Sequence, residues 1–496
     1  MAVLNPASGE TRERAWREWT ALLASRWVLA VVLAVTLVPF APTLADWFSG
    51  DDFWFLHAGQ TNSNLFTYIG KSFDPRNTGQ FLEYDRYRPL YPIAWRYEYA
   101  LFGLHAWAYH AVLVGMHLVC VALVWLIARR LFAEAWAAHL AALIFGLHPA
   151  YADAVSWLSG GNRVFEAVPY LASLLLFMSW HDAPASSRRP LLYAGCFALY
   201  VTAVLFHSSA LPLAVVFAAY AFILRGEPRD ALRARAWLPF APFAVVVVAE
   251  TAVQYWVRGH IGAGDGFRWG YHQFANYGQF LAYSLAPVST DGRSGLVLRL
   301  LDLWQAAAVI TMLAITVALL ITGMRYRLGL FALAWYWSAF LPDSTLFFQF
   351  QSRAMYVPGI ALAILLVAAA IWLRDRLAPA LLRQAVVAAP FVLAIGVAAV
   401  LPVTYDRTSA TRRFAAQNER FYQELGRALQ SLPAGATLYV VDPPGDLVLL
   451  GTESRLEALV QLRYGTSVRA HVATAEQADA VEARARPDER VFRFRP

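Results

Sequence analysis

Long apolar runs recur along the first four-fifths of the chain, and they restrict the fold more than any other feature. A membrane-crossing helix needs about 20 mostly apolar residues, and about 11 stretches approach that length. They lie at 27–46, 106–128, 135–149, 165–180, 190–206, 209–224, 236–257, 303–323, 328–342, 355–373 and 385–403. Short runs such as 135–149 would need tilt or flanking residues to cross. We therefore predict an all-α polytopic membrane protein.

Composition excludes other broad classes. Of 496 residues, 59% are hydrophobic and only 15% are charged, whereas soluble domains carry about 25% charged residues. The formal net charge is +7, but no basic run of the kind that binds phosphate backbones occurs, so we expect membrane lipids and no nucleic acid as partners. Cys120 and Cys196 both lie in apolar runs, and two cysteines at this spacing predict neither a disulfide framework nor a zinc site.

The polarity of the chain changes near residue 405. The last stretch, 405–496, is rich in both arginine and acidic residues, and we interpret 1–404 as a transmembrane domain followed by a small α/β domain. Alternating and periodic patterns in this tail predict three strands and two helices. The strands are expected at Thr437–Val441, Ser467–Val472 and Val491–Phe494, and the helices at Leu456–Leu462 and Glu476–Ala485. No catalytic motif is visible in the tail, which favours a binding or scaffolding role.

Arginines mark one set of connecting loops. The basic connectors contain Arg129/Arg130, Arg188/Arg189, Arg225–Arg235, Arg325/Arg327 and Arg374/Arg376/Arg383. By the positive-inside rule these loops are cytoplasmic. The aromatic loops 47–105, 150–164, 258–302 and 343–354 then face outward, and an odd number of spans places the tail there too. We expect a bacterial inner membrane with this face in the periplasm. A cleaved signal peptide at 27–45 is an alternative interpretation.

Two adjacent carboxylates open the first outer loop. Asp51 and Asp52 follow the first apolar run directly, and ionisable groups at a membrane boundary are costly to hold there. One of them is a candidate general base that takes a proton from an acceptor hydroxyl. The other would tune or orient it. The alternative is a solvated loop start or a helix cap.

Other polar residues of the outer loops are candidates for binding a substrate. Four arginines are candidates for holding a phosphate: Arg86, Arg88, Arg163 and Arg353. Guanidinium groups bind phosphate bidentately, although aromatic anchoring and snorkelling explain such arginines equally well. His148 and Asp153 lie within the same outer segment as Arg163. Gly160 and Gly161 would let the backbone approach a ligand closely.

Taken in order, these segments resemble the membrane O-mannosyltransferase-like proteins that often carry tetratricopeptide repeats. The resemblance rests on four motifs: Tyr87-Arg88-Pro89-Leu90; Phe145-x-x-His148-Pro149 followed by Asp153; Ser159-Gly160-Gly161-Asn162; and Arg353 with Tyr356 and Pro358. In that family the acidic residue after His-Pro is usually glutamate, and here it is Asp153. The tail is too short for a repeat array.

The resemblance implies a type-C glycosyltransferase (GT-C) fold with its active site on the outer face. Such enzymes take a sugar from a polyprenyl-phosphate carrier, here for a glycan, lipid or protein acceptor. The family's catalytic aspartate matches Asp51 or Asp52, and we favour Asp51. Arginines would stabilise the leaving phosphate, and four further residues would position the substrates: His148, Asp153, Asn162 and Tyr356. No metal ligands are predicted, although a divalent cation stays open because some relatives use one.

Two rival classes remain. A transporter or lipid-carrier flippase would bind its cargo near the bilayer midplane, often in repeated halves. The two halves of this chain show no evident symmetry, and the polar clusters gather at the outer edge. A non-catalytic assembly protein for envelope glycans, acting through the tail, is the other alternative.

Overall fold

The protein is mostly helical, with one small sheet near its C-terminus. A computed structural model describes residues 26–61, 64–77, 87–149, 152–184, 188–226, 228–258, 270, 272–273, 276–278, 280, 327–345, 352–376, 384–385, 388–389, 391–392, 406–451, 453–484 and 486–495. Seven helical segments in this part of the chain are long and apolar enough to cross a membrane. The chain is therefore a multi-pass membrane protein.

The seven segments coincide with seven of the predicted spans. They are Trp27–Ala45, Ala106–Leu131, Ser159–Asp182, Arg189–Phe206, Ser208–Arg225, Ala234–Val257 and Arg353–Arg376. The run at 135–149 forms a shorter apolar helix, Ala135–Leu147, and the run at 328–342 forms Arg327–Ser344. The predicted span 303–323, and most of 385–403, lie outside the described residues. The predicted total of about 11 spans is thus not confirmed.

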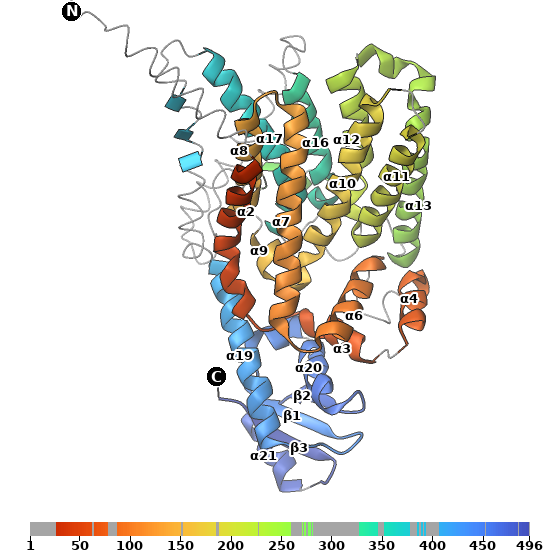
Figure 1. The fold of residues 1–496 in the computed structure, drawn as a ribbon. Helices are drawn as coiled ribbons and strands as arrows, with labels where there is room; N and C mark the ends of the chain where they lie inside the picture. The colour runs from red at the N-terminus through yellow and green to blue at the C-terminus, as the bar shows by residue number, and fades with distance from the viewer. Residues whose placement is uncertain are drawn as a thin grey trace, which may run out of the picture.

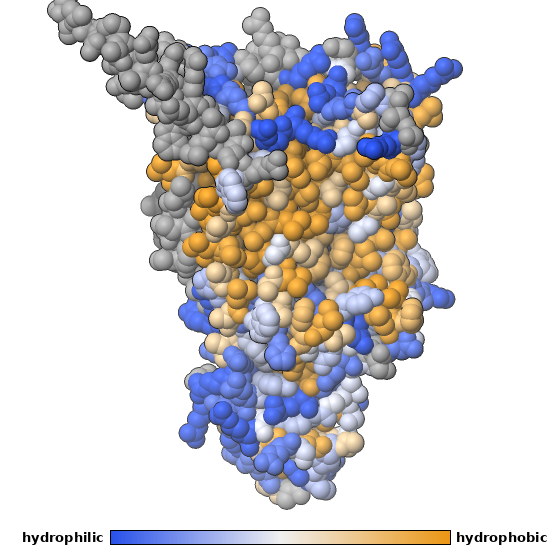
Figure 2. Space-filling view, viewed as in Figure 1, coloured by the Kyte–Doolittle hydropathy of each residue, from blue (hydrophilic) through white to orange (hydrophobic). Residues whose placement is uncertain are grey.

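The bundle is built from helices that pack side by side (Figure 1). In chain order they are α2 (Arg26–Phe40), α7 (Ala106–Leu131), α8 (Ala135–Leu147), α10 (Asn162–Asp182), α11 (Arg189–Phe206), α12 (Leu213–Ala219), α13 (Ala241–Arg258), α16 (Arg327–Ser344) and α17 (Tyr356–Arg376). Helix α7 has 26 residues and so spans about 39 Å at 1.5 Å per residue. Arg129 and Arg130 in its last turn complement the negative end of the helix dipole. On the face seen in Figure 2, an apolar band crosses the bundle, with more hydrophilic surface above and below it.

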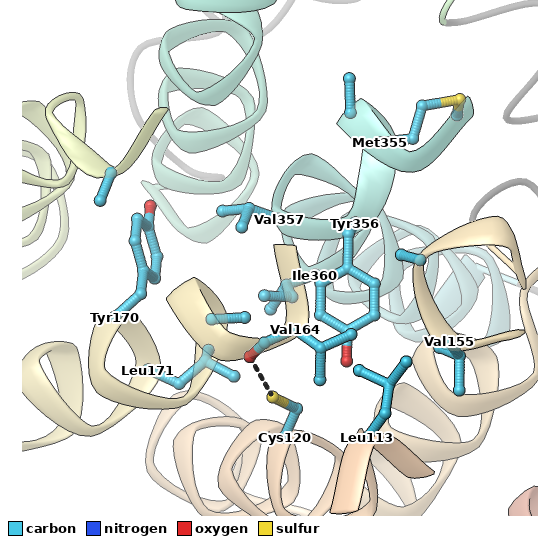
Figure 3. Close-up of a cluster of buried hydrophobic side chains, with 14 of the residues drawn as sticks. Leu113, Cys120, Val155, Val164, Tyr170, Leu171, Met355, Tyr356, Val357 and Ile360 are labelled. Atoms are coloured by element: carbon cyan, nitrogen blue, oxygen red, sulfur yellow. Dashed lines mark hydrogen bonds between the residues drawn. The ribbon is translucent and has the colours of Figure 1, made fainter. Parts of the chain in front are cut away.

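Helices α7, α10 and α17 meet in the core shown in Figure 3. Leu113 and Cys120 of α7 face Val164 of α10 and Ile360 of α17, and all four side chains are buried. The same cluster includes Val155 of the short helix α9 (Ala152–Ser156). Lipid tails are as apolar as these side chains, so close van der Waals packing is what holds membrane-spanning helices together here. This core therefore fixes α9 and the turn after it against the start of α17.

Short elements cap one end of the bundle. They are the 3₁₀ turn η1 (Ala41–Ala45), α3 (Asp52–Thr61), α4 (Leu65–Phe73), the 3₁₀ turn η2 (Pro75–Asn77), α6 (Leu90–Phe102), the 3₁₀ turn η4 (Ser159–Gly161) and the 3₁₀ turn η9 (Ser352–Met355). At or near the opposite end, α12 continues into the π-helical turn η6 (Tyr220–Arg225), and 3₁₀ turns follow at Pro228–Leu232 and Ala234–Phe240. Asp52 is the first residue of α3 in this first group, and Asp51 directly precedes it.

The C-terminal region forms a helix and a three-stranded parallel sheet. It contains α19 (Asp406–Ala428), β1 (Thr437–Val441), the 3₁₀ turn η10 (Gly445–Gly451), α20 (Ser454–Tyr464), β2 (Arg469–Val472), α21 (Ala475–Arg484) and β3 (Glu489–Arg493). The sheet order is β2-β1-β3, and Thr437 pairs with Arg469 on one side and Glu489 on the other. The predicted α/β character of the tail is confirmed. Helix α19, which joins the tail to the bundle, was not predicted.

The tail is docked on the cap of the bundle (Figure 1). Helix α20 packs on α3, where Gln60 donates a hydrogen bond to the Leu462 carbonyl at 3.0 Å. Arg412 of α19 forms an ion pair with Asp46, just after η1, at 3.3 Å. These contacts bring the tail against the first outer loop, where the paired carboxylates lie.

Candidate active site

Asp52 is a buried clamp rather than an exposed acid. It begins α3 and is 1% exposed. One carboxylate oxygen accepts a hydrogen bond from the Ser49 amide at 2.9 Å, and the other accepts from the Ser159 amide at 2.8 Å. The Ser159 hydroxyl also donates to it. Asp52 therefore ties the first outer loop to the turn η4, which was expected on sequence grounds to belong to the same site.

Burial decides the protonation of this carboxyl. It raises the pKa of Asp52 from 3.8 to about 7, against the opposing effect of the hydrogen bonds from Ser159 and Ser49, while the neighbouring charge of Asp51 raises it further. A carboxylate that already accepts three hydrogen bonds inside the protein has little reach toward a substrate hydroxyl. The geometry thus favours Asp51 over Asp52 as the candidate base.

Asp51 lies at the interface between the bundle and the tail. Its Oδ1 accepts a hydrogen bond from Nη2 of Arg455 at 2.5 Å, and both side chains are 13% exposed. Arg455 belongs to α20 in the tail. The residue before the pair, Gly50, has φ of +56°, a left-handed conformation that glycine adopts without strain. This turn sends Asp51 and Asp52 to different surroundings, although they are adjacent in sequence.

Trp157 connects the first outer loop to Arg353. Its indole nitrogen is 3.5 Å from the Ser49 carbonyl, and a Cβ on Gly50 would lie 3.9 Å from its ring. The guanidinium carbon of Arg353, in η9, lies 4.9 Å from the centre of the same ring, a cation–π geometry. The loop that carries Asp51 and the arginine that begins the last described span therefore contact one indole. This is the part of the predicted site that the structure assembles.

The two glycines of η4 serve packing, which differs from the predicted role in ligand approach. A Cβ on Gly160 would lie 2.9 Å from the Asp153 carbonyl oxygen, and one on Gly161 would lie 2.7 Å from the Leu113 side chain. A Cβ at either position would force its neighbour to shift, and at Gly160 that neighbour is backbone. Protein atoms take up the space that was assigned to a ligand, and the glycines allow η4 to sit close to α9 and α7.

Arg163 is enclosed in a different cluster, inside the bundle. It is 3% exposed, and its Nη2 donates to Asp343 of α16 while its Nη1 lies 3.7 Å from Glu166. Nη1 also donates to Ser209. A buried charge needs such partners, so the carboxylates account for Arg163 without a phosphate. The structure does not place its guanidinium beside Asp51.

Arg88 interacts electrostatically with Glu166 and so lies near the cluster of Arg163. Its own side chain is partly buried. Asn162, beside Arg163 at the start of α10, is 7% exposed, and its Oδ1 has no hydrogen-bond partner among the described residues. Arg86 lies outside the described residues.

The other predicted positioning residues are spread over the cap and the core. Tyr356 is fully buried, and its hydroxyl is 2.7 Å from Nδ1 of His117, whose other nitrogen is 3.1 Å from the Gly146 carbonyl. These contacts join α17 to α7, and they explain the burial of Tyr356 without a bound substrate. Asp153 in α9 and His148 at the end of α8 are partly buried, and the Asp153 backbone carbonyl accepts from the Trp157 amide at 3.2 Å.

A divalent cation would need several oxygen ligands in one place. Within the described ranges, no group of three or more His, Cys, Asp or Glu side chains is arranged to hold a metal ion. Asp52 is already enclosed by Ser49 and Ser159, and Asp51 is paired with Arg455. The described residues therefore do not fit a metal centre built on the paired carboxylates.

Sequence reasoning missed the contribution of the tail. Arg455 contacts Asp51 across 404 positions of sequence, and Asp446 accepts a hydrogen bond from the Gly50 amide at 3.0 Å. One signal for Asp446 was present: it closely follows Asp442-Pro443-Pro444-Gly445 at the end of the predicted strand. Sites in open parallel sheets lie at the carboxyl ends of strands. No local signal distinguishes Arg455 from the other tail arginines.

Comparison with known proteins supports the family resemblance. Mouse protein O-mannosyl-transferase TMTC2 is 30% identical over 103 residues, which are 21% of this chain and 12% of that protein. Drosophila melanogaster protein O-mannosyl-transferase Tmtc1 is 34% identical over 91 residues, 18% of this chain and 11% of that protein. The chain is similar to the membrane O-mannosyltransferase-like proteins. The match spans only about one eighth of the relatives' length, and no known family profile matches the chain.

Two solved structures align with most of this chain at low sequence identity. ArnT from Cupriavidus metallidurans in the apo state has a TM-score of 0.48 at 17% identity, covering 89% of this chain and 85% of ArnT. The oligosaccharyltransferase AglB from Archaeoglobus fulgidus, in complex with an inhibitory peptide and a dolichol-phosphate, has a TM-score of 0.45 at 12% identity, covering 90% of this chain and 64% of AglB.

Proposed function

We propose that the protein transfers a sugar from a polyprenyl-phosphate carrier to an acceptor hydroxyl. Asp51 takes the hydroxyl proton as the acceptor oxygen attacks the anomeric carbon. The bond from that carbon to the phosphate oxygen breaks, and its electron pair leaves with the polyprenyl phosphate. This single displacement inverts the anomeric configuration. The reaction takes place at the end of the bundle where the tail is docked, which we expect to be the periplasmic face of a bacterial inner membrane.

One observation carries the proposal: Trp157 lies between the loop of Asp51 and the guanidinium of Arg353. The loop that carries the proposed base and the positive charge of Arg353 thus contact the same side chain at the end of the apolar bundle. A displacement reaction needs this combination, because a proton must be removed on one side of the sugar while negative charge develops on the leaving group at the other. The names of the curated relatives, protein O-mannosyl-transferases, support the reaction class.

Arg353 is the arginine best placed to bind the phosphate. Its guanidinium lies over an indole and is partly buried, which lowers the local dielectric and strengthens its attraction for an anion. It stands at the first residue of the span Arg353–Arg376, at the depth where a lipid phosphate meets its apolar chain. We assign the phosphate to Arg353 because of this place at the end of the span. Arg163 is held by two carboxylates and is left as a charge that stabilises the bundle.

The same helix offers a matched control for this assignment. Arg376, at its other end, lies 4.0 Å from the centre of the Trp372 ring. Each arginine therefore lies over a tryptophan ring, and the two arginines are at opposite ends of the span Arg353–Arg376. If Arg353 only anchors the helix in the interface, replacing either arginine should have the same small effect.

The experiment supplies undecaprenyl-phosphate [¹⁴C]mannose to membranes that contain the protein. It measures the label that passes to the acceptors of those membranes together with the undecaprenyl phosphate released. We expect Arg353→Ala to raise the KM for the lipid donor about tenfold or more, since hydrogen bonds to charged groups contribute about 1.5–3 kcal/mol, and Arg376→Ala to leave it unchanged. Equal effects of the two substitutions would overturn the assignment of Arg353. The absence of any mannose transfer by the wild-type protein would remove mannose as the sugar.

A flippase would move the lipid carrier without breaking the sugar–phosphate bond. The same assay distinguishes the two classes, because a flippase yields no free undecaprenyl phosphate. A non-catalytic assembly protein would likewise give none, and its glycan phenotype would be insensitive to Asp51→Asn.

A further inference from the structure

The tail holds the proposed base in position. We propose that Arg455 of α20 is a positioning residue that orients the Asp51 carboxylate for proton transfer, so that the small C-terminal unit completes the active site instead of acting as a separate binding module. This inference rests on the proposed function, because it assigns Arg455 a role through Asp51.

Arg455 is itself held from three sides. Its Nη1 donates to the Asp446 carbonyl at 2.9 Å, its guanidinium carbon lies 5.1 Å from the centre of the Trp54 ring, and its Nη2 donates to Asp51. A planar guanidinium fixed in this way loses little further freedom when it binds a carboxylate. The arrangement corresponds to a general base whose orientation is set by a third group.

The surrounding contacts lock the tail against the loop that carries Asp51. The Asp446 carboxylate accepts hydrogen bonds from the Gly50 amide at 3.0 Å and from the Asn418 side chain at 2.9 Å. Asn418 is fully buried and belongs to α19. Asp446 follows the carboxyl end of β1, the edge of a parallel sheet where sites form. The segment after β1 therefore faces the bundle, at the loop that carries Asp51.

A second ion pair between the tail and the bundle separates positioning from docking. Arg412 of α19 binds Asp46 at 3.3 Å, with side chains 31% and 13% exposed. It joins the same two parts of the molecule but is paired with Asp46, not with Asp51. If Arg455 only helps to dock the tail, then the loss of Arg412 should have a comparable effect on activity.

The test compares four variants of the full chain in the undecaprenyl-phosphate [¹⁴C]mannose assay. We expect Arg455→Ala to lower kcat about tenfold or more, because small displacements of catalytic groups cost up to about 100-fold, with the KM for the lipid donor changed less than twofold. Arg455→Lys should recover part of the lost kcat, since it restores the charge without the fixed fork. Arg412→Ala should keep at least half of the wild-type kcat.

Asp51→Asn separates failure of this inference from failure of the proposed function. If Asp51→Asn is inactive while Arg455→Ala has wild-type kcat, the role of Arg455 is refuted and the proposed base stands. If Asp51→Asn is fully active, the proposed base itself fails. Limited trypsin proteolysis measures how firmly the tail is docked. If Arg455→Ala and Arg412→Ala both lose activity and both release the tail faster than wild type, then docking alone explains the loss. That result would overturn the inference.

Discussion

Replacing Asp52 with alanine tests whether this residue is a structural clamp. The substitution removes the acceptor for two buried backbone amides, those of Ser49 and Ser159, and for the Ser159 hydroxyl. Each buried donor left without an acceptor costs about 1–3 kcal/mol. The hydroxyl can rotate toward another acceptor, so the two amides dominate. We expect Asp52→Ala to lower the free energy of unfolding by about 2–6 kcal/mol.

Asparagine at the same position provides a graded comparison. Its side-chain oxygen can still accept from Ser159, while its amide nitrogen meets the Ser49 amide, which is also a donor. One donor is then left unsatisfied in place of two, and the expected loss is about 1–3 kcal/mol. The predicted order of stability is wild type, Asp52→Asn, Asp52→Ala.

The measurement is unfolding of the purified full chain in detergent micelles by a denaturant titration, followed by circular dichroism. The transition must be reversible for the free energies to be comparable. An Asp52→Ala protein within about 0.5 kcal/mol of wild type, the usual range for surface substitutions, would show that the three hydrogen bonds do not clamp the loop.

Three further outcomes follow from the described contacts. Burial raises the pKa of Asp52 to about 7, so between about pH 4 and 7 the folded protein binds a proton at Asp52 that the unfolded chain lacks. The unfolding free energy of wild type should therefore fall, relative to that of Asp52→Asn, as pH rises through this window. Parallel pH curves of the two proteins would contradict this. Gly160→Ala should destabilise by about 1–3 kcal/mol through overpacking against the Asp153 carbonyl, whereas an unchanged melting temperature would show that η4 moves freely. Arg163→Ala should destabilise by about 3–5 kcal/mol by leaving Asp343 without its buried partner; the same denaturant titration checks it, and a neutral effect would reopen Arg163 as a phosphate ligand.

The broad architecture could be predicted because it depends on local patterns. Apolar runs such as 106–128 and 355–373 appear as helices long enough to cross a membrane, and the strand at Thr437–Val441 appears with the predicted bounds. Hydrophobic content over a window of about 20 residues is enough to identify such a segment. Helix α19 was not predicted, although it carries the tail to the first outer loop.

The site was predicted less well because its contacts join residues far apart in sequence. Arg163 was a candidate phosphate ligand because it lies in the same outer segment as His148 and Asp153, yet its partner Asp343 is 180 positions away. Arg455 was one of several arginines in a polar tail, and its pairing with Asp51 depends on how the tail docks. Adjacent Asp51 and Asp52 could not be separated by sequence, because their different surroundings arise from the left-handed turn at Gly50 and the start of α3.

Transfer activity of Asp51→Asn, beside Asp52→Asn, is the measurement that most directly tests Asp51 as the base. Both variants would be quantified in membranes at matched amounts of folded protein, with transfer of the label from undecaprenyl-phosphate [¹⁴C]mannose to the membrane acceptors as the readout. Our account predicts that Asp51→Asn loses at least about 100-fold in kcat, within the 10²–10⁴-fold typical of general base catalysis, and that Asp52→Asn retains measurable turnover per folded molecule. Full activity of Asp51→Asn, with activity abolished in folded Asp52→Asn, would contradict it.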